Sequence, residues 1–289
     1  MSAAPLIDVL SSESFAREHI PGAVNLCVYE TAFPDKVRAA FPDPSAPLQV
    51  YGLCPTALEV RTALTRLREA GYQNVTELKG GLEGWKAAGG VPEGAGFPEE
   101  PASGTYRIDA AASFVRWTGT NVLNFHHGQL SLSAGSVTIE RGELKGGSFR
   151  IDMNSLSCAD LTDSAMNAML IKHLRSDDFF AVADFPVAEF TITAATPVAA
   201  LPGLPNCRIT GLLSLRGATR VLEIPASITH RDEGGYTARA FFGLDRTLWG
   251  SYYGSGRFFS RIGMHLVDDL VQIHLHVVTE KASTHESSQ

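Results

Sequence analysis

The chain has 289 residues, of which 44% are hydrophobic, and its formal net charge is -7 at pH 7. This length and apolar content allow more than one packed core, so we expect two domains. Lys and Arg are scattered along the chain, which argues against a nucleic acid partner because no basic surface is indicated. The sequence has neither a secretory signal pattern at its start nor a run of about 18 apolar residues, so we expect a cytoplasmic protein without a membrane span.

The first part of the chain predicts a parallel sheet flanked by helices. Short apolar runs (PLIDV, LQVYGL, NVTEL) alternate with stretches in which apolar residues recur at helical spacing. The run LQVYGL leads to Cys54, and apolar residues at helical spacing follow it as far as Gly71, so Cys54 lies where a strand gives way to a helix. Unpaired amides and the helix dipole at such a point lower the pKa of a thiol and make it a better nucleophile. The alternative is that Cys54 is a small buried hydrophobic residue.

Residues 1–92 resemble the rhodanese-like family. The resemblance rests on IDVL at Ile7 to Leu10, HIPGAVN at His19 to Asn25, the cysteine after an apolar strand, and GYQNVTELKGGLEGW at Gly71 to Trp85. It implies that Cys54 takes up a sulfane sulfur as a persulfide and passes it to a thiol or to cyanide. The loop that would hold the persulfide consists of Pro55, Thr56, Ala57, Leu58 and Glu59.

This loop departs from the family pattern C-x-x-G-x-R-S. Ala57 stands for the Gly, Glu59 for the Arg and Val60 for the Ser. Pro55 removes one amide donor, and a carboxylate at Glu59 would repel an anionic donor if it faces the site. We therefore expect weak thiosulfate activity, and we favour a neutral or persulfide donor. The other cysteines, Cys27, Cys158 and Cys207, form no CxxC pair and no dense framework, which suits a reducing compartment.

Composition predicts a linker over residues 93–104, within the Gly-, Pro- and Glu-rich stretch GGVPEGAGFPEEPASG. After the linker, apolar residues recur at every second position, which predicts β-strands, and Gly-rich turns separate these strands. This pattern is typical of an antiparallel sandwich or closed barrel. One helix is expected, over about residues 160–174, lying across the sheet or capping one end. The tail at residues 281–289 looks disordered.

Residues 105–280 resemble the YceI-like family, most specifically in the block from Lys172 to Phe180 and the block from Thr210 to Gly217. The resemblance implies an all-β, lipocalin-like barrel with one short helix that encloses a polyprenyl quinone or alcohol. No other cofactor is expected. An eight-stranded barrel either fills its interior with side chains or holds one small ligand, and the mixture of Ala and Phe at inward positions fits both.

Aromatic residues are the candidate ligand-binding residues of this half. They are Phe149, Phe179, Phe190, Phe242, Trp249, Tyr252 and Phe258. Those in the Gly-rich segment LWGSYYGSGRFF either plug one end of the barrel or line its entrance. No metal site is predicted: His126 and His127 are adjacent and point to opposite faces of a strand, and the His274 and His276 pair belongs to an outer, solvated face.

The sequence therefore favours binding of an isoprenoid-type lipid in the second domain, with a rhodanese-like domain before it. The alternative is a persulfide-forming sulfurtransferase that uses Cys54, with a thiol as sulfur acceptor and the barrel as a docking or lipid-substrate module.

Overall fold

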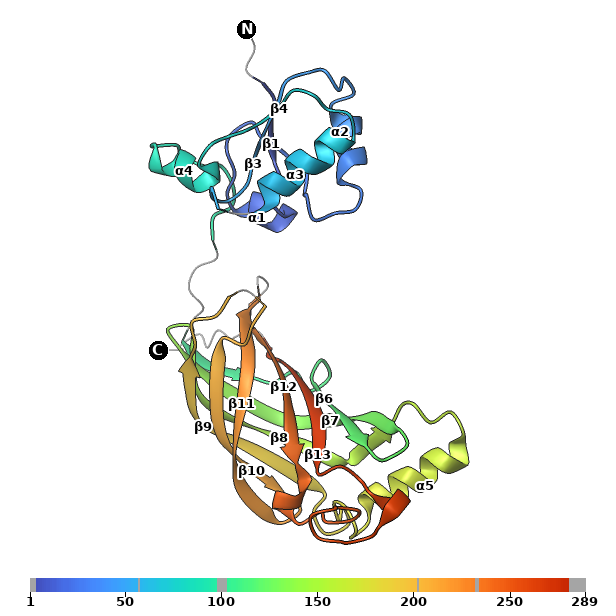
Figure 1. The fold of residues 1–289 in the computed structure, drawn as a ribbon. Coiled ribbons are helices and arrows are strands. Elements are labelled where there is room, and N and C mark those ends of the chain that lie inside the picture. Colours follow the sequence, from blue (N-terminus) through green and yellow to red (C-terminus); the bar gives the residue numbers. More distant parts are fainter. Residues whose placement is uncertain (1–3, 57, 98–102, 202, 232–233, 281–289) are drawn as a thin grey trace, which may run out of the picture. The chain divides into compact units, whose positions relative to one another are not determined.

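The computed structural model describes residues 4–56, 58–97, 103–201, 203–231 and 234–280. The chain divides between residues 99 and 100 into two compact units, each with its own sheet (Figure 1). The first has a parallel sheet with helices and the second an antiparallel barrel, as the sequence predicted.

The first unit is built on a four-stranded parallel sheet in the order β2-β1-β3-β4. Its strands are β1 (Leu6–Asp8), β2 (Val24–Asn25), β3 (Leu48–Tyr51) and β4 (Val75–Glu77). Its helices are α1 (Ser12–Arg17), α2 (Phe33–Ala40), α3 (Leu58–Glu69) and α4 (Gly81–Ala87). Three of the four residues of β3 are buried, which is typical of a central parallel strand covered on both faces.

Helix α3 follows β3 and packs along the sheet through one apolar stripe. Val60, Ala63 and Leu67 lie at helical spacing and are buried, the last two completely. Because β3 and α3 are both anchored in the core, the connection that carries Cys54 is held at its two ends.

The first unit extends further along the chain than the composition indicated, because the segment after α4 makes backbone contacts with it. The backbone of Glu93 bridges to that of His19, and the amide of Ala95 donates to the carbonyl of Ala16 at 2.8 Å. Gly94 has a φ of +138°, and a Cβ there would lie 2.4 Å from the carbonyl oxygen of Arg17. Gly94 thus allows a close backbone contact, where the sequence predicted the start of a linker. Residues 98–102 of that linker and the predicted disordered tail at 281–289 lie outside the described residues.

The second unit is a closed antiparallel barrel. Its strands are β5 (Gly104–Arg107), β6 (Phe114–Thr120), β7 (Phe125–Glu140), β8 (Glu143–Cys158), β9 (Val187–Pro197), β10 (Cys207–Leu215), β11 (Ala218–His230), β12 (Tyr236–Asp245) and β13 (Leu270–Val278). The order β7-β6-β13-β12-β11-β10-β9-β8 closes through pairing of β7 with β8, and β5 adds to β7 beyond the end of β6.

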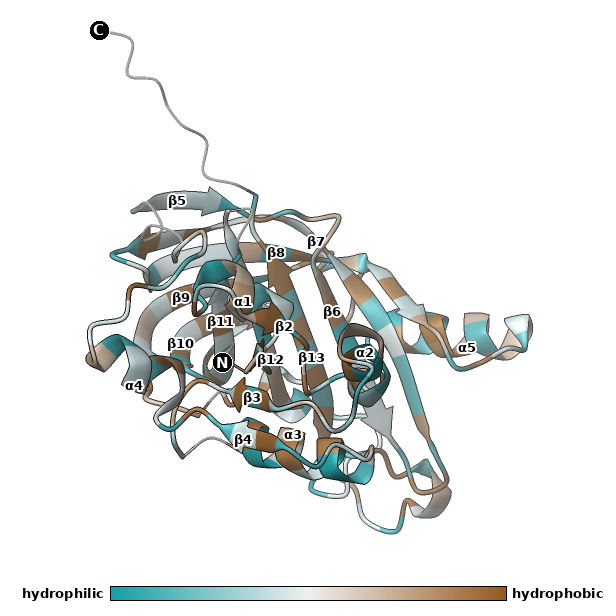
Figure 2. Cartoon of the chain, turned by 90° about the horizontal axis from the view of Figure 1, so that it is seen from above, coloured by the Kyte–Doolittle hydropathy of each residue, from teal (hydrophilic) through white to brown (hydrophobic). Residues whose placement is uncertain are grey.

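Side chains alternate between the two faces of the barrel strands, and the banded colouring of the strands in Figure 2 follows this alternation. In β10, for example, Ile209, Leu213 and Leu215 are buried while Leu212 is 39% exposed. Closure of the ring removes the unpaired strand edges that an open sheet would leave.

In the described part of this unit, three short helical elements lie outside the ring of strands: α5 (Ser164–Arg175), η1 (Arg246–Trp249) and η2 (Gly263–His265). Helix α5 is the helix expected near residues 160–174, and it contacts β8 at the end of the barrel drawn at the bottom of Figure 1. It starts at Ser164 because the carboxylate of Asp163 accepts the amides of Ala165 and Met166 as an N-cap.

Candidate functional site

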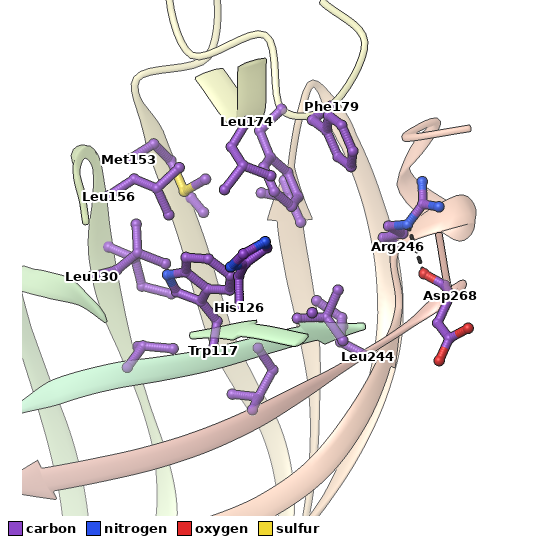
Figure 3. Close-up of a pocket in the computed structure, with 18 of the residues that line it drawn as sticks. Trp117, His126, Leu130, Met153, Leu156, Leu174, Phe179, Leu244, Arg246 and Asp268 are labelled. Atoms are coloured by element: carbon purple, nitrogen blue, oxygen red, sulfur yellow. Dashed lines mark hydrogen bonds between the residues drawn. The ribbon is translucent and has the colours of Figure 1, made fainter. Parts of the chain in front are cut away.

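The barrel encloses a cavity of about 340 Å³. Every strand of the ring contributes an apolar side chain to its wall: Trp117, Leu130, Met153, Phe190, Leu213, Ile224, Leu244 and Ile273. Figure 3 shows several of them, with Leu156 of β8 and Leu174 of α5, pointing into one common space. The cavity therefore presents an almost continuous apolar wall to a ligand.

The cavity occupies only one half of the barrel. In the half nearer β5 the interior is filled by buried side chains outside the cavity lining: Tyr106, Val137, Ile139, Leu144, Cys207, Tyr236 and Val277. The rings of Tyr106 and Tyr236 meet edge to face with centroids 5.1 Å apart, and burial raises the pKa of Tyr236 to about 12. The interior is thus packed with side chains in one half of the barrel and hollow in the other.

Polar groups gather at the α5 end of the cavity, where His126, His173, Arg246 and Asp268 reach the lining. Arg246 is 1% exposed, and its guanidinium donates to the carbonyls of Ser251, Val267 and Asp268 at 2.6, 3.1 and 3.0 Å. Figure 3 shows the bond to Asp268. Burial lowers the pKa of Arg246, while nearby carboxylates, Asp269 first, act in the opposite direction. The buried cation is satisfied by carbonyl groups and holds the segment before β13 against the turn after η1.

Four of the seven aromatic candidates line the cavity: Phe149, Phe179, Phe190 and Phe242. Phe179 also contacts the rings of His173 and Tyr253, with centroids 5.0 and 5.3 Å away. These three rings form part of the cavity wall at the α5 end.

The other three candidates lie elsewhere. Trp249 is 2% exposed but lies outside the cavity lining, and its indole N–H donates to the carbonyl of Leu213 at 3.0 Å. Tyr252 and Phe258 are 44% and 52% exposed and pack on each other with centroids 4.5 Å apart. Their neighbour Tyr253 lines the cavity instead. This segment has no regular period, so its sequence could not indicate which aromatic ring faces inward.

A cluster of His126, Cys158 and Asp160 lies at the edge of the cavity. Nδ1 of His126 is 2.8 Å from Oδ2 of Asp160, while Oδ1 accepts the amide of His127 at 2.8 Å and the thiol of Cys158 at 3.3 Å. Desolvation by burial acts to raise the pKa of Asp160, but these three hydrogen bonds together hold it at about 2. No sequence pattern indicates this group, because its members come from two separate segments.

In the first unit, Cys54 lies in the turn between β3 and α3, as predicted. The side chain is partly buried, and its Sγ lies 3.4 Å from Oγ1 of Thr56. Leu53 and Leu58, on either side of it, are 42% and 60% exposed. Ala57 of the predicted loop lies outside the described residues, and Pro55 provides no amide hydrogen.

Glu59 folds back against the chain that precedes the cysteine. Its side chain is buried, and Oε1 accepts the amide of Leu53 at 3.1 Å. A Cβ on Gly52 would lie 2.6 Å from Cγ of Glu59, so the glycine provides the space for this side chain. The carboxylate is thereby placed beside the cysteine turn and uses one of its backbone amides.

Comparison with known proteins agrees with both architectures. A YceI-like domain model matches residues 106–279, and a rhodanese-like domain model matches residues 1–88. The chain belongs to the YceI-like family and carries an additional rhodanese-like domain in its N-terminal part. No helix in the described ranges has both the length and the apolar character needed to cross a membrane.

Three similar proteins illustrate these matches. An adenylyltransferase and sulfurtransferase, UBA4, of Lodderomyces elongisporus is 34% identical over 84 residues, and a UPF0312 protein of Shewanella denitrificans is 31% identical over 118 residues. These alignments cover 28% and 40% of the chain but only 18% and 57% of those proteins. A polyisoprenoid binding domain from Saccharophagus degradans is 14% identical, with a TM-score of 0.44 over 61% of this chain and 98% of that one.

Proposed function

We propose that the barrel binds an isoprenoid-type lipid, a polyprenyl quinone or alcohol, in its cavity. The observation that carries the proposal is the apolar wall, to which every strand of the ring contributes. The volume, about 340 Å³, falls within the usual range of small-molecule sites of roughly 300–1,000 Å³. An isoprenoid chain is apolar and makes no hydrogen bonds, so it matches such a wall without leaving buried polar groups unpaired.

The polar end of the cavity suits the headgroup of such a lipid. A quinone or alcohol carries oxygen atoms at one end of an apolar chain, and His126 and His173 reach the cavity at one end of an apolar wall. In this arrangement the isoprenoid tail lies against the apolar side chains of the strands, and the headgroup lies near α5. Nδ1 of His126 is paired with Asp160 and Nε2 of His173 with Asp178, so the other ring nitrogen of each histidine is the one that hydrogen-bonds to the headgroup oxygens in this arrangement.

The test is binding of a short-chain polyprenyl quinone, measured by native mass spectrometry and by titration. Leu213→Trp places a larger ring in the cavity, whereas Leu212→Trp places the same ring on the outer face of the same strand. We expect the inward substitution to weaken binding by at least about tenfold and the outward one to leave it unchanged. Circular dichroism checks that both variants fold, because overpacking costs about 1–3 kcal/mol. A wild-type chain with no affinity for polyprenyl quinones would overturn the proposal.

A second function is favoured by the position of Cys54, which lies accessible to solvent in a strand-to-helix turn of a rhodanese-like domain. We infer that it carries persulfide sulfur. The thiolate attacks the outer sulfur of a persulfide donor, the donor leaves as a thiolate, and the Cys54 persulfide then transfers that sulfur to an acceptor thiolate. A persulfide donor suits the site better than thiosulfate, because Glu59 places a carboxylate beside the turn.

Sulfur transfer is measured by incubating the protein with a persulfide donor and recording both the protein mass and the thiocyanate released with cyanide. The expected result is one added sulfur on the wild type and on Cys27→Ser, and none on Cys54→Ser. Equal thiocyanate release by wild type and Cys54→Ser would exclude this function.

We further propose a cytoplasmic location. All four cysteines are free thiols in the structure, and two of them, Cys54 and Cys158, are partly accessible. A reducing compartment keeps such thiols available. Cell fractionation with a periplasmic marker tests this location.

A further inference from the structure

The cluster at the edge of the cavity combines three different metal-ligating groups. The ring nitrogen of His126, Sγ of Cys158 and a carboxylate oxygen of Asp160 all lie within 4.8 Å of one another, and each side chain is partly buried. Ligands on one tetrahedral ion lie several ångström apart, so small rotamer changes are enough to bring these atoms around a common centre.

The barrel fold itself brings the three residues together. His126 lies near the start of β7 and Cys158 at the end of β8, and these strands pair antiparallel with Gly128 opposite Cys158. The pairing continues one step further, because the amide of Ala159 donates to the carbonyl of His127 at 2.8 Å. Gly128 pairs directly with Cys158 and lies two residues after His126 on β7, so Cys158 projects on the side of His126. Asp160 follows the end of β8, and its Oδ2 lies 2.8 Å from Nδ1 of His126.

The segment from Cys158 to Leu161, which carries two of the ligands, is held in place by α5. Nδ2 of Asn167, on α5, donates to the carbonyls of Cys158 and Leu161, both at 3.0 Å. The amide of His127 fixes one oxygen of Asp160. Positions held in this way lose little freedom when an ion binds, which favours affinity.

We propose that His126, Cys158 and Asp160 form a binding site for a divalent transition metal ion of the zinc type. A thiolate, an imidazole and a carboxylate together favour Zn²⁺ or Co²⁺ over Mg²⁺ and Ca²⁺, which take oxygen ligands. The three side chains leave a fourth tetrahedral position. Because His126 is part of the cavity wall, that position faces the cavity and is open to water or to an oxygen atom of a bound molecule.

Metal binding at this site replaces the hydrogen bonds that now join its members. The hydrogen bonds from Cys158 and His126 to Asp160 break, and all three side chains coordinate the ion instead. The thiol of Cys158 releases its proton to solvent. Apart from this ionisation no covalent bond is made or broken, and no oxidant or reductant is needed.

The test is titration of the untagged, full-length chain with Co²⁺, followed by its visible spectrum and by the thiolate-to-cobalt charge-transfer band. We expect one equivalent to bind with that band present, and Zn²⁺ to displace it. Cys158→Ser should abolish the band, and His126→Ala should weaken Zn²⁺ binding by about tenfold or more in competition with a chromophoric chelator.

Two controls separate this site from other ligands of the chain. Cys54→Ser removes the other partly accessible thiol, and His127→Ala removes the neighbouring imidazole, which lies on the opposite face of β7. Both should bind Co²⁺ as the wild type does. Absence of the charge-transfer band in the wild type, or its loss in Cys54→Ser and retention in Cys158→Ser, would overturn the proposal whether or not the other variants fold.

Discussion

The carboxylate of Glu59 accepts a hydrogen bond from the amide of Leu53, the residue directly before Cys54. A negative charge is therefore fixed beside the turn in which the thiosulfate dianion would lie if Cys54 transfers sulfur as proposed. At partly exposed distances such a charge costs an anion on the order of 1 kcal/mol.

This placement predicts the effect of Glu59→Gln on thiosulfate turnover. Glutamine keeps an oxygen for the Leu53 amide and removes the charge, so kcat/KM for thiosulfate should rise about fivefold, which corresponds to about 1 kcal/mol. The matched control is Glu69→Gln, at the exposed far end of α3. If kcat/KM for thiosulfate is the same in Glu59→Gln and wild type, the carboxylate does not limit the reaction.

Replacing the buried guanidinium should destabilise the barrel selectively. Arg246→Met leaves three carbonyl groups without their donor, and we expect the free energy of unfolding of the barrel to fall by about 3 kcal/mol. Differential scanning calorimetry resolves this if the two units melt separately. Arg220→Met, on the exposed face of β11, is the control and should change the barrel transition little. A shift in the transition of the first unit instead would contradict the argument.

The lowered pKa of Asp245 predicts that the stability of the barrel depends on pH. Desolvation by burial acts to raise the pKa of Asp245, but hydrogen bonds from Thr247 and Arg257 hold it below its ordinary value. A carboxyl group whose pKa is lower in the folded state stabilises the fold above its unfolded pKa of about 3.9, and this contribution is lost as the pH falls through the folded pKa.

A double-mutant cycle with Asp245→Asn and Arg257→Gln measures this contribution. We expect a coupling of about 0.5 kcal/mol at pH 7, because Arg257 is 55% exposed and solvent screens the pair. The coupling should shrink as the pH is lowered below about 4. A coupling that stays constant down to pH 2 would show that the pair does not lower the pKa of Asp245.

Gly94→Ala tests where the first unit ends. The added Cβ would lie 2.4 Å from the carbonyl oxygen of Arg17, at a φ that side chains rarely adopt, so the first unit should lose on the order of 2 kcal/mol of stability. Gly104→Ala, where nothing lies within 4 Å of the new Cβ, should have little effect on it. Equal melting of the first unit in both variants would mean that residues 93–96 contribute nothing to it.

Much of this architecture could be predicted because it depends on periodic burial. Alternation along Ile209, Leu213 and Leu215 places one face of β10 inside, and any closed antiparallel barrel needs that pattern. The position of Cys54 was predictable for the same reason, since a buried strand and an amphipathic helix adjoin it directly in sequence.

Features that depend on three-dimensional pairing were not predictable. The cluster of His126, Cys158 and Asp160 depends on the register between β7 and β8, which shifts at irregularities such as the one between Gln129 and Ser131. The inward orientation of Tyr253 rather than Tyr252 depends on an aperiodic turn. Gly94 reads as a linker residue by composition, although its role is a close backbone contact that only the fold reveals.

The packed half of the barrel has a consequence for ligand selection. If an isoprenoid binds as proposed, with its headgroup near α5, the far end of its chain meets the packed side chains around Tyr106 and Tyr236. A short isoprenoid would then be enclosed completely, whereas each further isoprene unit would stay outside, among α5 and the loops near it. Affinity is then expected to rise with the length of the isoprenoid chain only until the chain fills the cavity, so the proposed site would discriminate ligands by their length as well as by their polarity.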